Sequence, residues 1–150
     1  MKQIPNLSYG TLMRIMKSVP IVCVEVLIVD KNCILLAKRN IQPFKGMWHF
    51  TGGLLHYNEK LVQAAKRIAK KESGAKVKIL KYHGYRDYIR KDPRGHLIAH
   101  IFTAKKIGGT IKANKENNDL RYFNHVPKDM IEFHKPVLRD VLKDIHGDRK

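Results

Sequence analysis

The chain has few cysteines and no long uncharged apolar run. The longest apolar segment, residues 19–29, is interrupted by Glu25 and is too short to span a bilayer. No basic start followed by an apolar core and a small-residue cleavage site is present, so we expect a cytoplasmic protein without a membrane partner. Cys23 and Cys33 lie in apolar segments, which favours two buried free thiols over a disulfide or a metal pair.

Acidic residues are scarce as well: 13 Asp and Glu stand against 30 Lys and Arg, and the formal net charge is +17. A field of this sign attracts polyanions and raises their rate of encounter. Nucleotides, phosphosugars and RNA fit it equally well. Because the cations are spread along the whole chain, a cation-rich solvated surface fits too, and charge alone does not identify the ligand.

The length of 150 residues and the hydrophobic fraction of 43% suit one compact domain, residues 1–150. Apolar side chains recur at helical spacing over residues 6–17 and predict a short N-terminal helix that Pro20 ends. Segments rich in β-branched residues then predict a hairpin of two strands, residues 21–29 and 33–37.

A central helix is predicted over residues 58–73, with Asn58 as its N-cap and Gly74 as its stop. Strands, one central helix, more strands and a terminal helix together indicate a mixed α/β sandwich. The later strands are expected at residues 77–89, 97–105 and 120–123, and the C-terminal helical segments at residues 127–146, interrupted at Lys135 and Pro136.

Residues 53–75 resemble the Nudix box, GX5EX7REUXEEXGU, in which U is a bulky apolar residue. The register is kept without gaps, and a chance helix rarely supplies both end glycines and both charges. The resemblance implies a Nudix hydrolase with the Nudix fold, an α/β (α+β) protein with a mixed β-sheet sandwich between helices. The matching positions are Gly53, Glu59, Arg67, Glu72 and Gly74. Of these, Glu59 and Arg67 are expected to form an internal ion pair that anchors the loop.

In this family the box holds divalent metal against a pyrophosphate, and the chain departs from it at two positions. Residues 68, 71 and 72 share one helical face, and three carboxylates there would need hard cations such as Mg²⁺ between them. Ile68 and Lys71 replace two glutamates and leave Glu72 alone. One carboxylate facing an ammonium cannot assemble a multi-metal site, which argues against metal-assisted attack on phosphorus.

The same loss of carboxylates is found in the GDP-mannose mannosyl hydrolases. The chain also resembles this subfamily in residues 19–20 (Val-Pro), in residues 38–39 (Lys-Arg) and in the acid at Glu25. That resemblance implies a single Mg²⁺ or Mn²⁺ ion that neutralises a diphosphate. Water then attacks the sugar carbon, and the nucleoside diphosphate departs.

The resemblance also implies a set of site residues. Glu72 would be a catalytic metal ligand, and the carbonyl of Gly52 a second ligand. Arg39 would contact the diphosphate, and Glu25 the nucleoside. Glu116 stands where the subfamily has a metal-binding glutamine, and its carboxylate suits Mg²⁺ well.

A general base and one phosphate contact are missing from their expected places. Asn117 stands where the subfamily carries a basic histidine, and an amide cannot accept a proton at neutral pH. Leu54 replaces the arginine that follows the double glycine. His56 and His100 are therefore the candidate substitute bases.

Three further features bear on the ligand. Lys71 is either a solvated lysine or a point charge that binds phosphate. Trp48 either packs against the box loop or stacks on a base. The turn at residues 92–96 resembles one found in Nudix enzymes that act on ADP-ribose and similar conjugates.

Two functions compete at this stage. The first is a Mg²⁺-dependent hydrolase for a nucleoside diphosphate linked to a sugar or another group. The second is a catalytically impaired Nudix-fold protein that binds nucleotide or RNA, which the net charge of +17 and Lys71 favour. An RNA-decapping activity is a third, and the eroded acidic cluster argues against it. A homodimer is left open.

Overall fold

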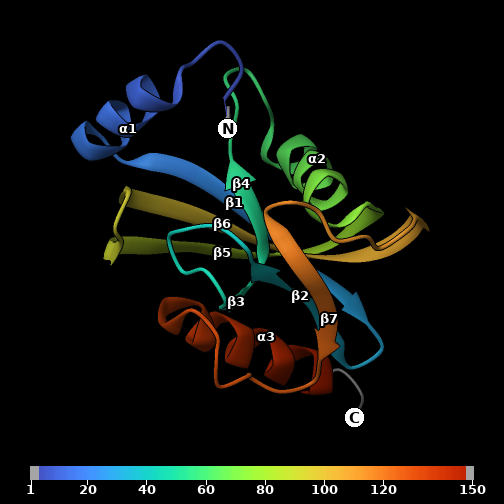
Figure 1. Ribbon diagram of the computed structural model, residues 1–150. Helices are drawn as coiled ribbons and strands as arrows, with labels where there is room; N and C mark the ends of the chain where they lie inside the picture. The colour runs from blue at the N-terminus through green and yellow to red at the C-terminus, as the bar shows by residue number, and fades with distance from the viewer. Residues whose placement is uncertain (1–3, 148–150) are drawn as a thin grey trace.

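The computed structural model describes residues 4–147, which fold around one mixed sheet of seven strands (Figure 1). The predicted α+β fold, a mixed sheet between helices, is confirmed. In chain order the elements are α1 (Tyr9–Ser18), β1 (Ile21–Asp30), β2 (Cys33–Arg39), β3 (Trp48–His49), β4 (Thr51–Leu54), α2 (Leu61–Ser73), β5 (Ala75–Asp92), β6 (Gly95–Gly109), β7 (Asn117–Phe123), the 3-10 helix η1 (Glu132–His134) and α3 (Lys135–Gly147).

The strand β1 determines where a site can form. It runs parallel to β6 over residues 21–29, and its middle is buried on both faces. Its other edge is divided, because β4 pairs with residues 23–26 whereas β2 pairs only with residues 29–30 to make the predicted hairpin. Within residues 4–147 no strand pairs with the outer edge of β4, so that edge is open.

Helices cover both faces of the sheet. The apolar side of α2, including Ala65 and Ile68, packs with Val24 and Val26 of β1. On the other face α1 and α3 pack with Leu27 and its neighbours. Figure 1 shows α2 above the sheet and α3 below it. Because alternate residues of a strand point to opposite faces, β1 contributes to both cores.

The helix α2 begins later than predicted but ends where predicted. Lys60 is the N-cap, and its backbone N–H donates to the side chain of Gln63 at 3.0 Å. Asn58 instead adopts a φ of 59° in the preceding turn, so its prediction as the N-cap is wrong. Gly74 does end the helix: its φ is 78°, and a Cβ there would lie 2.2 Å from the Thr110 carbonyl oxygen.

The C-terminal part differs most from the prediction. Strands β5, β6 and β7 are all longer than expected. Residues 127–131 are not helical. The backbone N–H of Trp48 donates to the backbone carbonyl of Asp129 at 2.8 Å and binds this segment to β3. Lys135 and Pro136 do not interrupt a helix but begin α3, since a proline in the first turn lacks only an N–H that has no helical partner there.

Both cysteines are free thiols, but only Cys23 is buried, so the prediction of burial is wrong for Cys33. Burial raises the pKa of the Cys23 thiol well above its usual value, which makes it a poor nucleophile. Among residues 4–147, none of the helices is long and apolar enough to cross a membrane.

Candidate functional site

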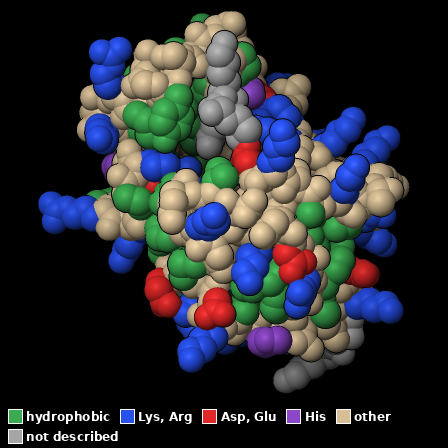
Figure 2. All heavy atoms as spheres, in the orientation of Figure 1, with side chains coloured by type: hydrophobic (Ala, Val, Ile, Leu, Met, Phe, Trp, Pro, Cys, Tyr) green, Lys and Arg blue, Asp and Glu red, His purple; other side chains and the backbone are tan. Residues whose placement is uncertain are grey.

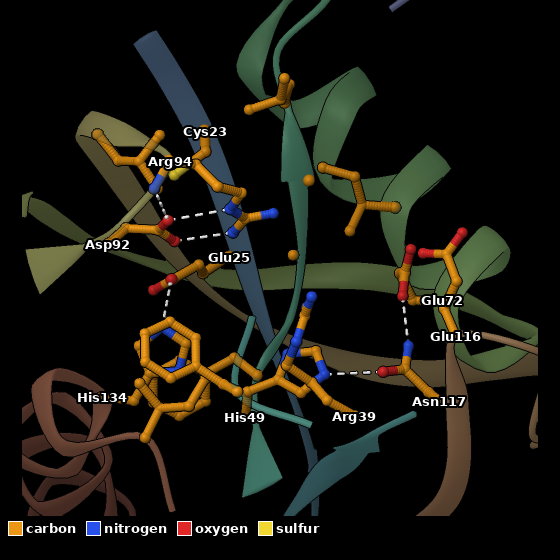
Figure 3. A pocket seen from close by; sticks show the side chains of 18 of the residues that line it. Cys23, Glu25, Arg39, His49, Glu72, Asp92, Arg94, Glu116, Asn117 and His134 are labelled. Atoms are coloured by element: carbon orange, nitrogen blue, oxygen red, sulfur yellow. Dashed lines mark hydrogen bonds and ion pairs between the residues drawn. The ribbon is translucent and has the colours of Figure 1, made fainter. Parts of the chain in front are cut away.

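A cleft of about 1020 Å³, counting its open mouth, lies along the open edge of β4 (Figure 3). The cleft has two parts. The end of α2 and the start of β7 line one part, and η1 with the neighbouring sheet face lines the other. Concave sites that mix apolar walls with a few polar groups are typical of small-molecule binding. The charged and other polar side chains of its lining are Glu25, Arg39, His49, Arg67, Lys71, Tyr88, Glu72, Asp92, Arg94, Glu116, Asn117 and His134.

The backbone of β4 presents a carbonyl to this cleft. The N–H of Leu55 donates to the carbonyl of Val22 at 3.0 Å, which makes that facing pair a hydrogen-bonded one. Hydrogen-bonded and non-hydrogen-bonded pairs alternate along an antiparallel ladder, so the facing residues Glu25 and Gly52 exchange no backbone bonds. The Gly52 carbonyl therefore points away from β1, toward the open edge.

Residues 68, 71 and 72 of α2, where the Nudix box carries glutamates, have three different environments. Ile68 is 1% exposed and packs on Gly53, where a Cβ would lie 3.2 Å from Ile68 Cγ1. Lys71 is exposed and lines the cleft at its rim. Glu72 is 8% exposed and lines the cleft. The face of α2 thus supplies one wall residue, one cation and one acid.

Glu59 and Arg67 join the loop before α2 to the helix. Arg67 donates from Nε and Nη2 to the two oxygens of Glu59, at 2.7 and 2.9 Å, and from Nη2 to the carbonyl of Leu54 at 2.8 Å. The backbone N–H of His56 donates to Glu59 at 3.0 Å. The hydrogen bonds from Arg67 hold the pKa of Glu59 below its usual value. This pair orders the loop that precedes the helix.

Glu72 is an acid in an unfavourable place. Burial raises the pKa of its carboxyl, and the nearby charge of Glu116 raises it further, while Lys71 and a hydrogen bond from Asn117 act in the opposite direction. Asn117 Nδ2 donates to Glu72 Oε2 at 2.5 Å. Figure 3 shows the Glu72 and Glu116 side chains next to each other. Two carboxylates thus meet at the cleft wall with one ammonium nearby.

Asn114 holds the segment just before β7, which contains Glu116, against the end of α2. Its Nδ2 donates to the backbone carbonyl of Glu72 at 3.2 Å. Its Oδ1 accepts the backbone N–H groups of Glu116 and Asn117, both at 2.9 Å. The two acids therefore come from segments that are tied together, although they are far apart in the chain.

A second contact links Asn117 to β3. His49 Nε2 and Asn117 Oδ1 lie 2.8 Å apart, and both residues are buried. Burial lowers the pKa of His49 to about 3, so its imidazole is neutral at physiological pH. The close view shows Asn117 between the His49 imidazole and the Glu72 carboxylate (Figure 3).

Arg39 ends β2 and also lines the cleft. Its Nε donates to the carbonyl of Pro43 at 2.6 Å, and its backbone N–H donates to Met47 at 3.0 Å. Burial lowers the pKa of its guanidinium, and the charge of Arg94 contributes to the same shift. An arginine remains charged despite such a shift. The cleft therefore has a fixed cation whose charge interacts with those of Glu72 and Glu116.

The other part of the cleft holds a paired acid, Glu25. Its Oε1 lies 2.9 Å from His134 Nε2, and its Oε2 accepts the hydroxyl of Tyr88 at 3.0 Å. Phe50 stacks on the His134 ring with centroids 4.6 Å apart, and Nδ1 of His134 is buried without a hydrogen-bond partner. Burial raises the pKa of Tyr88, so it stays protonated and donates to the carboxylate. We call Glu25, Tyr88 and His134 the Glu25 trio.

The turn between β5 and β6 carries another ion pair of the cleft. Arg94 donates from Nη2 to Asp92 Oδ2 at 2.7 Å and from Nε to Oδ1 at 2.9 Å. Burial alone would raise the pKa of Asp92, but the hydrogen bonds and charge of Arg94 outweigh it and lower that pKa. The turn singled out in the sequence thus contributes two side chains to the site.

The two histidines named as candidate bases lie outside the cleft lining. Neither His56 nor His100 lines the cleft, and His100 bonds to the hydroxyl of Tyr82 at 2.8 Å. Trp48 is buried and does not appear in the cleft lining, and its ring meets Phe123 of β7 with centroids 4.8 Å apart. The histidines that do line the cleft are His49 and His134. Neither has a spacing motif, because the tertiary fold alone brings them to the site.

Comparison with known proteins assigns this cleft to a family. The Nudix domain family matches residues 19–144, which include the box, the open edge of β4 and the Glu25 trio. This chain belongs to the Nudix family. Residues 53–75, which resemble the Nudix box, run from the end of β4 through the connecting loop and α2, and α2 presents Glu72 to the cleft.

Three relatives illustrate the range of the match. The ADP-ribose pyrophosphatase of Methanocaldococcus jannaschii is 33% identical over 130 residues, which cover 85% of this chain and 76% of the relative. The low-salt glycan biosynthesis protein Agl8 of Haloferax volcanii is 29% identical over 115 residues, which cover 73% of this chain and 74% of Agl8. The MutT Nudix hydrolase of Burkholderia pseudomallei superposes with a TM-score of 0.75 at 24% identity, covering 82% of this chain and 98% of that one, and so shares the fold.

Proposed function

We propose that this Nudix protein is a hydrolase that cleaves a nucleoside diphosphate linked to a sugar or another group, with one Mg²⁺ or Mn²⁺ ion. One observation carries the proposal: the acids Glu72 and Glu116 and the Gly52 carbonyl lie in the same cleft as the cations Arg39 and Lys71. Oxygen ligands suit a divalent ion, and cations suit the phosphates that such an ion binds. ADP-ribose, named for the relative from M. jannaschii, is a substrate of this class.

The donor set fits a single hard cation. Burial and the charge of Glu116 raise the pKa of Glu72, which is the behaviour of a carboxylate that lacks a sufficient positive partner. In the described chain, residues 4–147, no three His, Cys, Asp or Glu side chains come together as a metal site. Two carboxylates and one carbonyl therefore suit one ion that keeps several waters, as Mg²⁺ does, and do not suit a multi-metal cluster.

Each lining residue then has a role. Glu72, Glu116 and the Gly52 carbonyl would hold the ion, which when bound would offset the charge that develops on a departing diphosphate. Arg39, held through Nε by Pro43, would bind phosphate oxygens with its remaining N–H groups. Lys71 would add a point charge at the rim.

We propose that the nucleoside lies in the part lined by the Glu25 trio. This part also contains the half-buried Phe133, whose ring suits a flat base. Glu25 was expected to contact the nucleoside directly, but His134 and Tyr88 occupy both of its oxygens. We therefore propose that the nucleoside contacts the Glu25 trio together, and not the Glu25 carboxylate alone.

We further propose that water attacks the sugar carbon and not phosphorus. The support is that α2 brings only one carboxylate to the cleft, since Ile68 is in the wall and Lys71 is a cation. Attack at carbon releases a nucleoside diphosphate and the free sugar. Attack at phosphorus releases a nucleoside monophosphate and a sugar phosphate. Hydrolysis in ¹⁸O-labelled water distinguishes the two, because the label enters the sugar in the first case and a phosphate in the second.

The test of hydrolysis is a panel of nucleotide sugars, ADP-ribose and dinucleotides, assayed with Mg²⁺ and with EDTA. We expect Mg²⁺-dependent turnover of at least one nucleoside diphosphate conjugate and loss of it in Glu72→Gln. Asp144→Asn is the matched control, since Asp144 is an exposed acid of α3 whose carboxylate meets Lys81. No turnover of any compound by the wild type would overturn the proposal.

A second candidate function is a Nudix-fold protein that binds nucleotide or RNA without hydrolysis. It is favoured by the Lys71 ammonium beside Glu72 and by the net charge of +17. Lys and Arg side chains are scattered over the visible face and are not gathered in one groove (Figure 2). Nucleotide affinity that is equal in Mg²⁺ and in EDTA supports this function over hydrolysis. RNA affinity that falls steeply with salt identifies RNA as the ligand.

A further inference from the structure

We propose that His49, acting through Asn117, is a positioning residue that fixes the Glu72 carboxylate for the divalent ion. The inference rests on the proposed function, because it assigns a role to two neighbours of a proposed metal ligand. The three side chains come from three elements: His49 from β3, Asn117 from the start of β7 and Glu72 from α2. No spacing motif in the sequence joins them.

The three residues form a continuous buried chain of hydrogen bonds. His49, Asn117 and Glu72 are 7%, 1% and 8% exposed. The His49 Nε2 to Asn117 Oδ1 distance is 2.8 Å, and the Asn117 Nδ2 to Glu72 Oε2 distance is 2.5 Å. Buried polar groups bonded in this way are held in position, because breaking either bond leaves an unpaired group away from water.

The chemistry of the groups sets the direction of each bond. An ionised carboxylate only accepts, so Asn117 must turn its amide nitrogen toward Glu72 and its oxygen toward His49. With Asn117 in this orientation, the bond to its Oδ1 requires the His49 tautomer that carries a proton on Nε2. A flipped Asn117 amide would place oxygen against the carboxylate and nitrogen against an N–H, which loses both bonds. A proton on His49 Nε2 therefore reinforces the amide orientation in which Asn117 Nδ2 meets Glu72.

Two consequences follow for the site. The bond from Asn117 occupies Glu72 Oε2 and leaves Oε1 as the oxygen for a cation. His49 uses its Nε2 proton to orient Asn117, so it cannot also take a proton from water through that atom. His49 is thus assigned to orientation and not to general base catalysis. Partners of this kind, one step behind a ligand, tune metal affinity strongly when they are removed.

The experiment measures Mn²⁺ binding by calorimetry on the intact protein, without substrate. His49→Phe keeps a ring but removes the donor, and Asn117→Leu keeps the shape but removes both bonds. We expect each to weaken Mn²⁺ about 10-fold or more. His49→Gln, which retains an N–H donor, should recover most of the affinity. The control is Asn118→Leu, because Asn118 is the exposed neighbour and its side chain donates to Asn40 Oδ1 at 3.4 Å.

A double-mutant comparison tests whether His49 acts through Glu72. In a Glu72→Gln background, His49→Phe should change the remaining Mn²⁺ affinity less than two-fold. Unchanged affinity in His49→Phe and Asn117→Leu, with loss in Glu72→Gln, would overturn the positioning role and leave the hydrolase proposal standing. No Mn²⁺ binding by the wild type would overturn both.

An independent measurement on the wild type avoids the risk that His49→Phe fails to fold. Long-range ¹H–¹⁵N NMR of the imidazole should report a neutral His49 with its proton on Nε2. A second spectrum, recorded with diamagnetic Mg²⁺ in place of the paramagnetic Mn²⁺ used for calorimetry, should show the same tautomer, because the bond to Asn117 is kept. A proton on Nδ1 instead of Nε2 would contradict the proposed direction of the chain.

Discussion

Two glutamates of this cleft are buried to nearly the same extent, 6% for Glu25 and 8% for Glu72, yet their surroundings differ. Glu25 has a histidine on one oxygen and a tyrosine hydroxyl on the other. Glu72 has one amide and lies near a second acid, Glu116. A buried acid with partners is part of the structure, and a buried acid without enough of them is available to a ligand.

The largest expected effect concerns stability at Glu25. Glu25→Ala should lower the free energy of unfolding by about 3–5 kcal/mol, because His134 and Tyr88 lose their buried partner. Glu72→Ala should cost less, since it also removes a charge that the fold disfavours. Urea denaturation measures both, with Asp144→Ala as the exposed control. Equal losses for Glu25→Ala and Glu72→Ala would contradict the distinction between the two acids.

The next effect is the stabilisation by a bound cation, which should depend on Glu72 and not on Glu25. Mn²⁺ at about 100 times its Kd should stabilise the wild type by about 2.7 kcal/mol, because only the folded chain binds it. Glu72→Gln should lose this gain, whereas Glu25→Gln should keep it. Thermal unfolding with and without Mn²⁺ measures the shift. A gain that depends on Glu25 and not on Glu72 would move the metal site to the other part of the cleft.

A smaller effect follows from the raised pKa of Glu72. An acid whose pKa is raised by folding contributes stability that is complete below its unfolded pKa and is lost as the pH rises through its folded pKa. Without metal, Glu72→Gln should therefore be more stable than the wild type at neutral pH. The difference should narrow as the pH falls toward the ordinary glutamate value of about 4.3. Urea denaturation in EDTA at several pH values measures it, and a difference independent of pH would contradict the raised pKa.

The smallest effect concerns the rim cation. Lys71→Met should weaken nucleoside diphosphate binding only a few-fold, about 0.5–1 kcal/mol, because an exposed charge is screened by solvent. The loss should shrink further at high salt. Lys70→Met is the matched control, since Lys70 is the exposed neighbour on the same helix and does not line the cleft. An equal effect of both variants would assign Lys71 to the general positive field and not to the phosphate site.

Much of the fold could be predicted because its determinants are local. The helical spacing that leads to Gly74, the hairpin after Ile21 and the box itself all depend on residues close in the chain. The errors arose where a local signal was outweighed by a partner far away. Residues 127–131 are bound to β3 instead of coiling, because the backbone N–H of Trp48 donates to the Asp129 carbonyl. Propensity is a weak prior wherever tertiary pairing supplies the backbone hydrogen bonds.

By itself, the sequence determined the family, the sheet-and-helix order and the presence of an acid at position 72, because each depends on residue types at short, regular spacing. The tertiary structure alone decided which acids are paired and which are not. The register of β4 on β1 turns the Gly52 carbonyl outward, and the meeting of β3, β7 and α2 places His49 and Asn117 behind Glu72. Hydrogen bonds act over about 3 Å, so a role that depends on them is defined only once distant segments lie in contact.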